Sequence, residues 1–271
     1  MTMMQRDRRA GLLAVPVIIL LAAASAAAQD ATALAKTTQN PVGDIIAVPF
    51  QFNFNGGGGL EDQTHFNLNF QPVVPIKLSP DVNLIFRTIV PFHSFPAQST
   101  ERNGGWGDIQ AQLFVTPASP GQVIWGVGPM FSLPTATASA AQTGTWAGGV
   151  SAVVLAMPGP WVVGSLFTQV WPMADTGAAP ETDVFSWQYF LNYNFGQGWA
   201  LSSAPTIVAN WDAEKGQQWT VPFGAGLTRT LVFKGQPMSL GFQYYYNVEK
   251  PDDAPRTQAR FIVSFIFPTK R

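Results

Sequence analysis

Residues suited to acid–base or nucleophilic chemistry are few in this chain. It has two histidines and no cysteine among 271 residues. His93 stands beside Ser94, but neighbouring side chains on an extended strand point apart, so the two are poorly placed as base and nucleophile. His65 has no second histidine or cysteine at metal-ligand spacing, which favours a position in a lumen or at a loop end. The sequence therefore predicts no catalytic site, no metal and no cofactor.

Two other features resemble binding motifs without their spacing. The run GGGG at residues 56–59 is followed by no phosphate-loop pattern and opens no helix, so we expect a flexible loop. The acidic segments DAEKG (212–216) and EKPDDAPR (249–256) lack the alternating oxygen ligands of a calcium loop. We expect both to be exposed loops.

The clearest spacing belongs to polar residues, most of them uncharged, at every second position. In GWGDIQAQLFVTP (105–117), Asp108, Gln110 and Gln112 alternate with apolar side chains. The segments VPFQFNFN (48–55) and HFNLNFQ (65–71) repeat the pattern with phenylalanine or leucine against asparagine and glutamine. Because successive side chains of a strand point to opposite faces, each segment predicts a strand with one polar and one apolar face.

Composition indicates which environment the apolar face of each strand contacts. Charged residues make up 11% of the chain, against a usual share of about 25%, and aromatic residues make up 13%. After the first thirty residues no run of eighteen apolar residues occurs, so no transmembrane helix is expected. A weakly charged, aromatic-rich chain of alternating strands is typical of a membrane β-barrel whose apolar face meets lipid.

The first residues form an export signal. Three arginines precede an apolar stretch that ends in AAA at residues 26–28, which predicts a signal peptide over 1–28. We expect residues 29–44 to form a periplasmic N-terminal segment and residues 45–271 to form an outer-membrane β-barrel. Without Arg6, Asp7, Arg8 and Arg9, the net charge falls from −1 to −3, which gives no support for nucleic-acid binding.

Alternation along the chain predicts an all-β fold: an antiparallel up-and-down transmembrane β-barrel of about 12 strands. Most of these segments are long enough to cross a bilayer when tilted. The connections alternate between short and long, which predicts short periplasmic turns and longer extracellular loops. The expected strands are 45–55, 64–72, 82–90, 107–117, 122–132, 144–157, 160–171, 184–195, 198–211, 217–229, 238–248 and 257–267.

Tryptophans lie close to the ends of the expected strands. Amphipathic indole rings gather where membrane meets water, so this placement also favours a barrel, although core tryptophans are the ordinary alternative. The tryptophans expected at the membrane interface are Trp106, Trp146, Trp161, Trp171, Trp199, Trp211 and Trp219.

The polar faces of the strands would line the lumen. Their charged members are few, so each needs a partner or water inside a wall of low charge. Two interpretations remain open: these groups brace the lumen through buried salt bridges, or they form a constriction that screens solutes by size and charge. The candidate lumen residues are Asn67, Asn69, Arg87, Asp108, Gln110, Gln112, Gln243 and Arg260.

Seven segments occur in an order that resembles one bacterial outer-membrane β-barrel family. They include LAKTTQNPVGDIIAVPFQFNFN, NLIFRTIVPF, GWGDIQAQLFVTP, VIWGVGPMFSLPTAT, PGPWVVGSLFTQVW, YFLNYNFGQGWAL and WTVPFGAGLTR. The family is related to the phenol meta-pathway (MetA) transporters, and its members often carry the misleading label "neuromedin U". The resemblance implies an outer-membrane barrel with a transport or channel role and names no solute. In outer-membrane barrels that end on an aromatic residue, the assembly machinery reads that residue, whereas here Phe267 is followed by four more residues.

The sequence thus predicts a channel in the outer membrane for passive passage of a small, apolar or aromatic, solute. Its expected partners are outer-membrane lipid, the barrel-assembly machinery and the solute. Two alternatives are a structural or loop-binding barrel with a plugged lumen and, less favoured, an outer-membrane lipid hydrolase.

Overall fold

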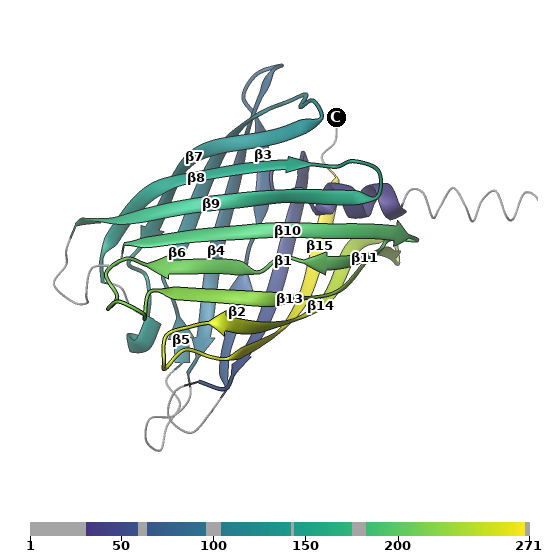
Figure 1. Cartoon of the computed structure of the whole chain (residues 1–271). Helices are drawn as coiled ribbons and strands as arrows, with labels where there is room; N and C mark the ends of the chain where they lie inside the picture. The colour runs from purple at the N-terminus through teal and green to yellow at the C-terminus, as the bar shows by residue number, and fades with distance from the viewer. Residues whose placement is uncertain (1–30, 59–63, 96–103, 142–143, 175–182, 269–271) are drawn as a thin grey trace, which may run out of the picture.

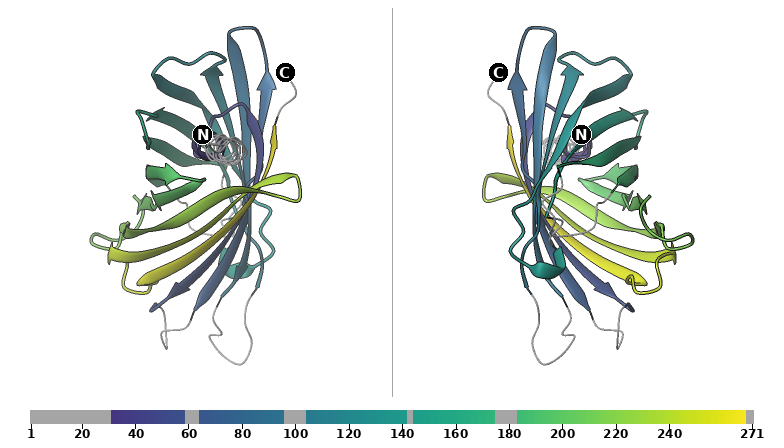
Figure 2. Two further views of the ribbon diagram at one scale, coloured as in Figure 1. Left: turned by 90° about the vertical axis from the view of Figure 1, so that its right-hand side faces the viewer. Right: turned by 90° about the vertical axis from the view of Figure 1, so that its left-hand side faces the viewer.

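A computed structural model describes residues 31–58, 64–95, 104–141, 144–174 and 183–268. Its strands form one antiparallel sheet that closes into a barrel (Figures 1 and 2). Closure comes from β1 (Ile45–Gly56), which pairs with β15 (Thr257–Pro268) along its whole length, from Ile45 opposite Pro268 to Gly56 opposite Thr257. No backbone edge is left along this seam, as a strand wall in lipid requires.

In the described ranges, fifteen strands make up the twelve positions of the barrel wall, because three positions are each shared by two short consecutive strands. Two of these breaks contain Pro72 and Pro205, which lack the backbone N–H that a continuous ladder needs. The shared positions are β2 (His65–Phe70) with β3 (Val73–Lys77), β5 (Gly104–Trp106) with β6 (Ile109–Pro117), and β11 (Trp199–Ser203) with β12 (Thr206–Asn210).

The remaining strands each fill one position in the wall. The prediction of about twelve antiparallel strands is therefore confirmed. The largest differences are that residues 73–77 extend the second position, that the strand expected at 82–90 continues to Ser94, and that the strand expected at 217–229 continues to Phe233. Besides β1 and β15, the strands that each fill one position are β4 (Val82–Ser94), β7 (Val123–Leu133), β8 (Trp146–Ala156), β9 (Trp161–Ala174), β10 (Val184–Gly196), β13 (Trp219–Phe233) and β14 (Gln236–Glu249).

The two ends of the barrel differ in the length of their connections, as predicted. The short-turn end carries 78–81, 118–122, 157–160, 197–198 and 234–235, whereas the long-loop end carries 57–64, 95–103, 134–145, 175–183, 211–218 and 250–256. Both central residues of the two shortest turns have positive φ, including Gln197 at 51° and Lys234 at 48°. This is the hairpin geometry whose twist matches the flanking strands. The 3-10 helix η2 (Ser139–Ala141) lies in one of the long loops.

The outer face of the wall is apolar and exposed. On β6, Val115 is 41% exposed, whereas Gln112 and Phe114 on the opposite face are 4% and 0% exposed. Outward-facing aromatic rings pack across β1 and its two neighbours. The Phe54 ring lies 5.1 Å from that of Phe66 on β2 and 6.1 Å from that of Phe261 on β15. Large exposed side chains of this kind recur on most wall strands, which matches a surface solvated by lipid.

The expected interface tryptophans lie within three residues of a strand end and form two groups. Trp106, Trp146, Trp171, Trp211 and Trp219 are near the long-loop end, whereas Trp161 and Trp199 begin strands at the short-turn end. Among them, Trp106 and Trp146 are about half exposed, at 50% and 51%. The arrangement of the two tryptophan groups at opposite ends of the wall fits the aromatic girdles of a membrane barrel.

Residues 31–44 do not hang free of the barrel but pack against its inner wall at the short-turn end. A short helix over 31–38 lies beside the end of β10 (Figure 1). Lys36 donates from Nζ to the carbonyl oxygens of Met157 and Gly159, at 3.1 and 2.7 Å. The side-chain amides of Gln39 and Asn194 hydrogen-bond each other. Within the part of the chain that the structure describes, no helix is long and apolar enough to cross a bilayer.

The outward direction of Leu113 generates a prediction. Leu113→Lys places an ammonium in the lipid-facing wall and is expected to destabilise the folded barrel by about 2–4 kcal/mol if it lies near the bilayer midplane. Denaturant unfolding in lipid vesicles and the heat-dependent shift on a gel measure this change. Gln110→Lys is the matched control, because Gln110 on the same strand lines the interior cavity. Equal stability of both variants would contradict the assigned faces.

Candidate functional site

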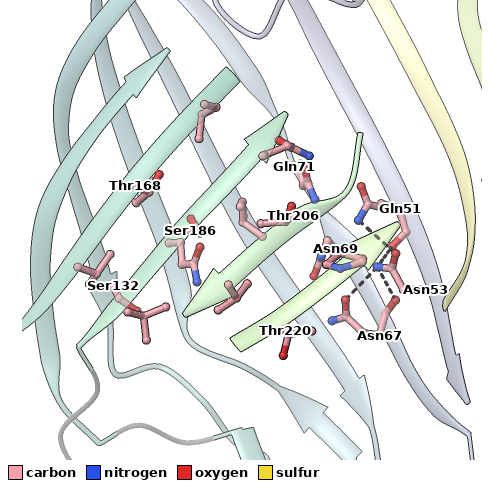
Figure 3. Close-up of a pocket in the computed structure, with 18 of the residues that line it drawn as sticks. Gln51, Asn53, Asn67, Asn69, Gln71, Ser132, Thr168, Ser186, Thr206 and Thr220 are labelled. Carbon is pink, nitrogen blue, oxygen red and sulfur yellow. Dashed lines mark hydrogen bonds between the residues drawn. The ribbon is translucent and has the colours of Figure 1, made fainter. Parts of the chain in front are cut away.

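The interior of the barrel carries a ladder of side-chain amides. Strand β1 turns Gln51, Asn53 and Asn55 inward, opposite Asn67 and Asn69 of β2 in the sheet register (Figure 3). Gln51 donates from Nε2 to Asn53 Oδ1 at 3.2 Å, and Asn53 donates from Nδ2 to Asn67 Oδ1 at 3.0 Å. Amide donors thus meet amide acceptors, so the polar atoms of this wall are satisfied without charge.

Arg260 projects from β15 into the lumen beside this ladder and is 6% exposed. Its guanidinium donates to Asn53 Oδ1 at 3.1 Å, to the Ala204 carbonyl oxygen at 2.9 Å and to Gln258 Oε1 at 2.8 Å. The carbonyl of Ala204 is available because the break between β11 and β12 releases it from the sheet. The guanidinium also lies 4.9 Å from the centroid of the Tyr245 ring, at a cation–π distance.

Arg87, on β4, is held in the same way. It donates to Gln112 Oε1 and to Gln71 Oε1, each at 3.3 Å. Gln112 in turn donates from Nε2 to Ser151 Oγ at 3.2 Å and to Thr168 Oγ1 at 3.3 Å, which fixes its orientation. Within the described residues, the recorded partners of both arginines are neutral oxygens, so hydrogen bonds to amides and carbonyls take the place of the salt bridges that the sequence left open.

Asp108 differs from its expected place. Its side chain is 7% exposed, but Oδ1 accepts a hydrogen bond from the backbone N–H of Ala136 at 2.8 Å, and Asp108 lines neither of the cavities described below. The residue lies in the break between β5 and β6, where the strict alternation of strand faces is interrupted. Asp108 therefore anchors the loop that follows β7.

The wall across from the amide ladder is apolar toward the short-turn end. Inward side chains of β4, β6, β8, β9 and β10 form a buried cluster with Val42 of the N-terminal segment. The added Cβ of an alanine at Gly126 would lie 3.4 Å from Val42 Cγ1, so the segment sits directly on the wall. The members are Val42, Ile85, Phe114, Val153, Leu155, Val162, Leu166 and Phe190.

This cluster was missed because the prediction placed apolar side chains on the lipid face only. Where both faces of a strand are apolar, as in VSAVVLAM (150–157), the period of two disappears from the sequence. The loss of alternation in 144–171 was the available signal that the adjoining lumen is partly apolar and filled.

Residues that the structure describes line two cavities in the lumen. The larger, of about 630 Å³, faces the long-loop end and includes Asn55 and Thr145, and the smaller, of about 230 Å³, faces the short-turn end and includes Gln39 and Ser264. Five side chains line both cavities and so mark the boundary between them; we name them the constriction ring. They are Gln51, Gln71, Arg87, Gln188 and Arg260.

The other candidate lumen residues fall on both sides of this ring. Asn67, Asn69, Gln110 and Gln112 line the larger cavity, and Gln243 lines the smaller one, where it accepts a hydrogen bond from the Tyr245 hydroxyl at 2.9 Å. Two of the ring residues, Arg87 and Arg260, were among the candidates. Their assembly into one ring comes from four separate strands and one strand break, which local spacing does not reveal.

Both histidines lie on the lumen side near the long-loop end. His65 Nε2 and His93 Nδ1 are 3.1 Å apart, at hydrogen-bond distance, and the ring of Phe95 stacks over both imidazoles. His65 also lines the larger cavity. The position of His65 inside the lumen therefore agrees with the expectation for it.

Comparison with solved structures identifies the type of fold. No protein-family model and no curated protein matches the sequence. Among solved structures, the COG4313 outer membrane channel from Pseudomonas putida F1 superposes with a TM-score of 0.62 at 12% identity, covering 82% of this chain and 94% of that one. The NanC porin superposes with a TM-score of 0.54 at 8% identity, covering 82% and 100%. The chain therefore has the fold of outer-membrane β-barrels, and its exposed apolar belt agrees with a position in that membrane.

Proposed function

We propose that this protein is an outer-membrane channel through which a small solute with an apolar or aromatic body passes passively. The observation that carries the proposal is the pair of cavities that meet at the constriction ring inside a closed wall. A kinship with the phenol meta-pathway transporters is part of the same proposal and rests on the ordered sequence segments described above.

The lining supports a solute that is not purely hydrophilic. Leu166 and Val170 of β9 and Met130 of β7 line the larger cavity opposite the amide ladder. Such a mixed surface can remove apolar area from water while polar groups fix the solute's orientation. The volume of about 630 Å³ falls within the range of about 300–1,000 Å³ that is usual for small-molecule sites.

A liposome-swelling experiment tests the channel. Vesicles containing the folded protein are expected to swell faster in small aromatic alcohols or amides than in sugars of similar mass, relative to protein-free vesicles. Because apolar solutes also cross bare lipid, the rate is compared at several protein-to-lipid ratios, and only the protein-dependent part counts. If no solute enters faster as protein is added, and planar bilayers show no conductance, the channel proposal is wrong.

A plugged barrel with functional loops is the second candidate, and the N-terminal segment favours it. Val42 is 5% exposed within the apolar cluster, and Gln39 bonds the inner wall, so this segment narrows the smaller cavity. Passage through the barrel requires either a path beside the segment or its displacement.

Loosening the segment distinguishes the two candidates. Val42→Asp buries a carboxylate among apolar side chains, which costs several kcal/mol and should release the segment. We expect a several-fold rise in single-channel conductance, whereas Ala33→Asp, at an exposed position of the same segment, should leave it unchanged. Conductance that is absent in both the parent and Val42→Asp would favour the plugged barrel.

A further inference from the structure

The two arginines of the constriction ring give the described lining of the two cavities a net positive charge. Among the described residues that line the two cavities there is no aspartate, glutamate or lysine, whereas Arg87 and Arg260 line both. A guanidinium stays protonated in proteins, so each contributes a full positive charge. Buried charges in proteins are usually paired with an opposite charge or a metal. Here the ring holds two cations without a described counter-charge.

The hydrogen bonds of these arginines fix their positions without neutralising them. Gln71 and Gln112 occupy two of the five N–H donors of Arg87, and Asn53, Ala204 and Gln258 occupy three of those of Arg260. These hydrogen bonds do not use the other N–H donors of the two guanidiniums, and both side chains border the cavities. Donors that are held in place before a ligand arrives lose little conformational entropy on binding it.

The opposite wall adds an apolar counterpart. Leu166, Val170 and Met130 line the larger cavity, and Phe190 of β10 lines the smaller one. A solute that spans the ring therefore meets guanidinium donors on one side and hydrocarbon on the other. Inorganic anions would use only the first of these surfaces, whereas uncharged aromatic solutes would use the second and gain no charge attraction from the first.

From this arrangement we propose that the constriction ring binds the carboxylate of a small organic anion whose apolar body lies against the β7–β10 wall. The inference rests on the proposed channel function and names its solute class. A carboxylate matches the planar donor fork of arginine, and an anion is drawn to a site of uncompensated positive charge in a wall of low dielectric. Benzoate is a probe of this class, and benzamide is its neutral counterpart of nearly equal shape.

Two measurements on the folded full-length mature protein test the proposal. In planar bilayers under a KCl gradient, the reversal potential should show preference for chloride over potassium, and added benzoate should reduce the chloride current. In vesicles, benzoate should enter faster than benzamide in the protein-dependent part of the rate. The Arg87→Gln variant should weaken the benzoate block about tenfold, the size expected for losing one charge-assisted contact.

Matched variants separate charge at the ring from other effects. Arg87→Lys keeps the charge and should retain most of the chloride preference, although it loses the planar fork. Arg229→Gln is the control, because Arg229 is exposed on the outer face over the Trp199 ring. The heat-dependent gel shift verifies folding of each variant, and Arg260, with three structural hydrogen bonds, is left intact.

The outcomes distinguish the failure of each proposal. A conducting channel that prefers potassium, or in which benzoate and benzamide behave alike in the parent and in Arg87→Gln, overturns the organic-anion site while the channel stands. Preference for chloride without any block by benzoate also overturns it, because the ring would then be a simple charge filter. Absence of all conductance and uptake instead overturns the channel on which the inference rests.

Discussion

The structure depends on the need to satisfy every backbone hydrogen bond within the wall. Lipid offers no partner for an N–H or a carbonyl group, and each unsatisfied group costs several kcal/mol. The pairing of β1 with β15 meets this requirement by joining the two ends of the sheet, with Gly56 opposite Thr257. Once the wall is closed, each strand has one face toward lipid and one toward the lumen. Side chains at alternate positions therefore contact lipid or the lumen.

The breaks in the wall are where the site is built. A carbonyl group within a continuous strand already accepts a hydrogen bond of the ladder, whereas a carbonyl at a break is free of the ladder. The break at Ala204 supplies a carbonyl to Arg260, and the break at Gln71 supplies a side-chain oxygen to Arg87. Both breaks contain a proline, whose missing N–H makes an uninterrupted ladder impossible. Two buried guanidiniums are thereby stabilised by neutral oxygens, which leaves their charge available to the lumen.

Much of the fold could be predicted from the sequence because strand alternation is a local property. In segment 48–55, the alternation of apolar and polar residues is visible in the sequence itself, and the structure has the apolar face outward and the polar face toward the lumen as expected. The positions of the tryptophans and the sorting of connections into short and long were also accessible, because turn chemistry and interface preference act within a few residues. The continuation of the second wall position through 73–77 was missed, since a strand interrupted at Gln71 and Pro72 reads as two unrelated pieces.

The candidate site was only partly predictable, because its members come together through contacts between distant segments. Local patterns of residues are enough to predict an all-β barrel, the inward direction of Gln112, Arg87 and Arg260, and the low charge of the lumen. Tertiary structure decided that Asp108 anchors a loop, that Val42 packs inside the barrel, and that the two arginines border the same two cavities. Alternation depends on the geometry of one strand, whereas these arrangements depend on barrel closure, which sets the side chains that face each other across the lumen.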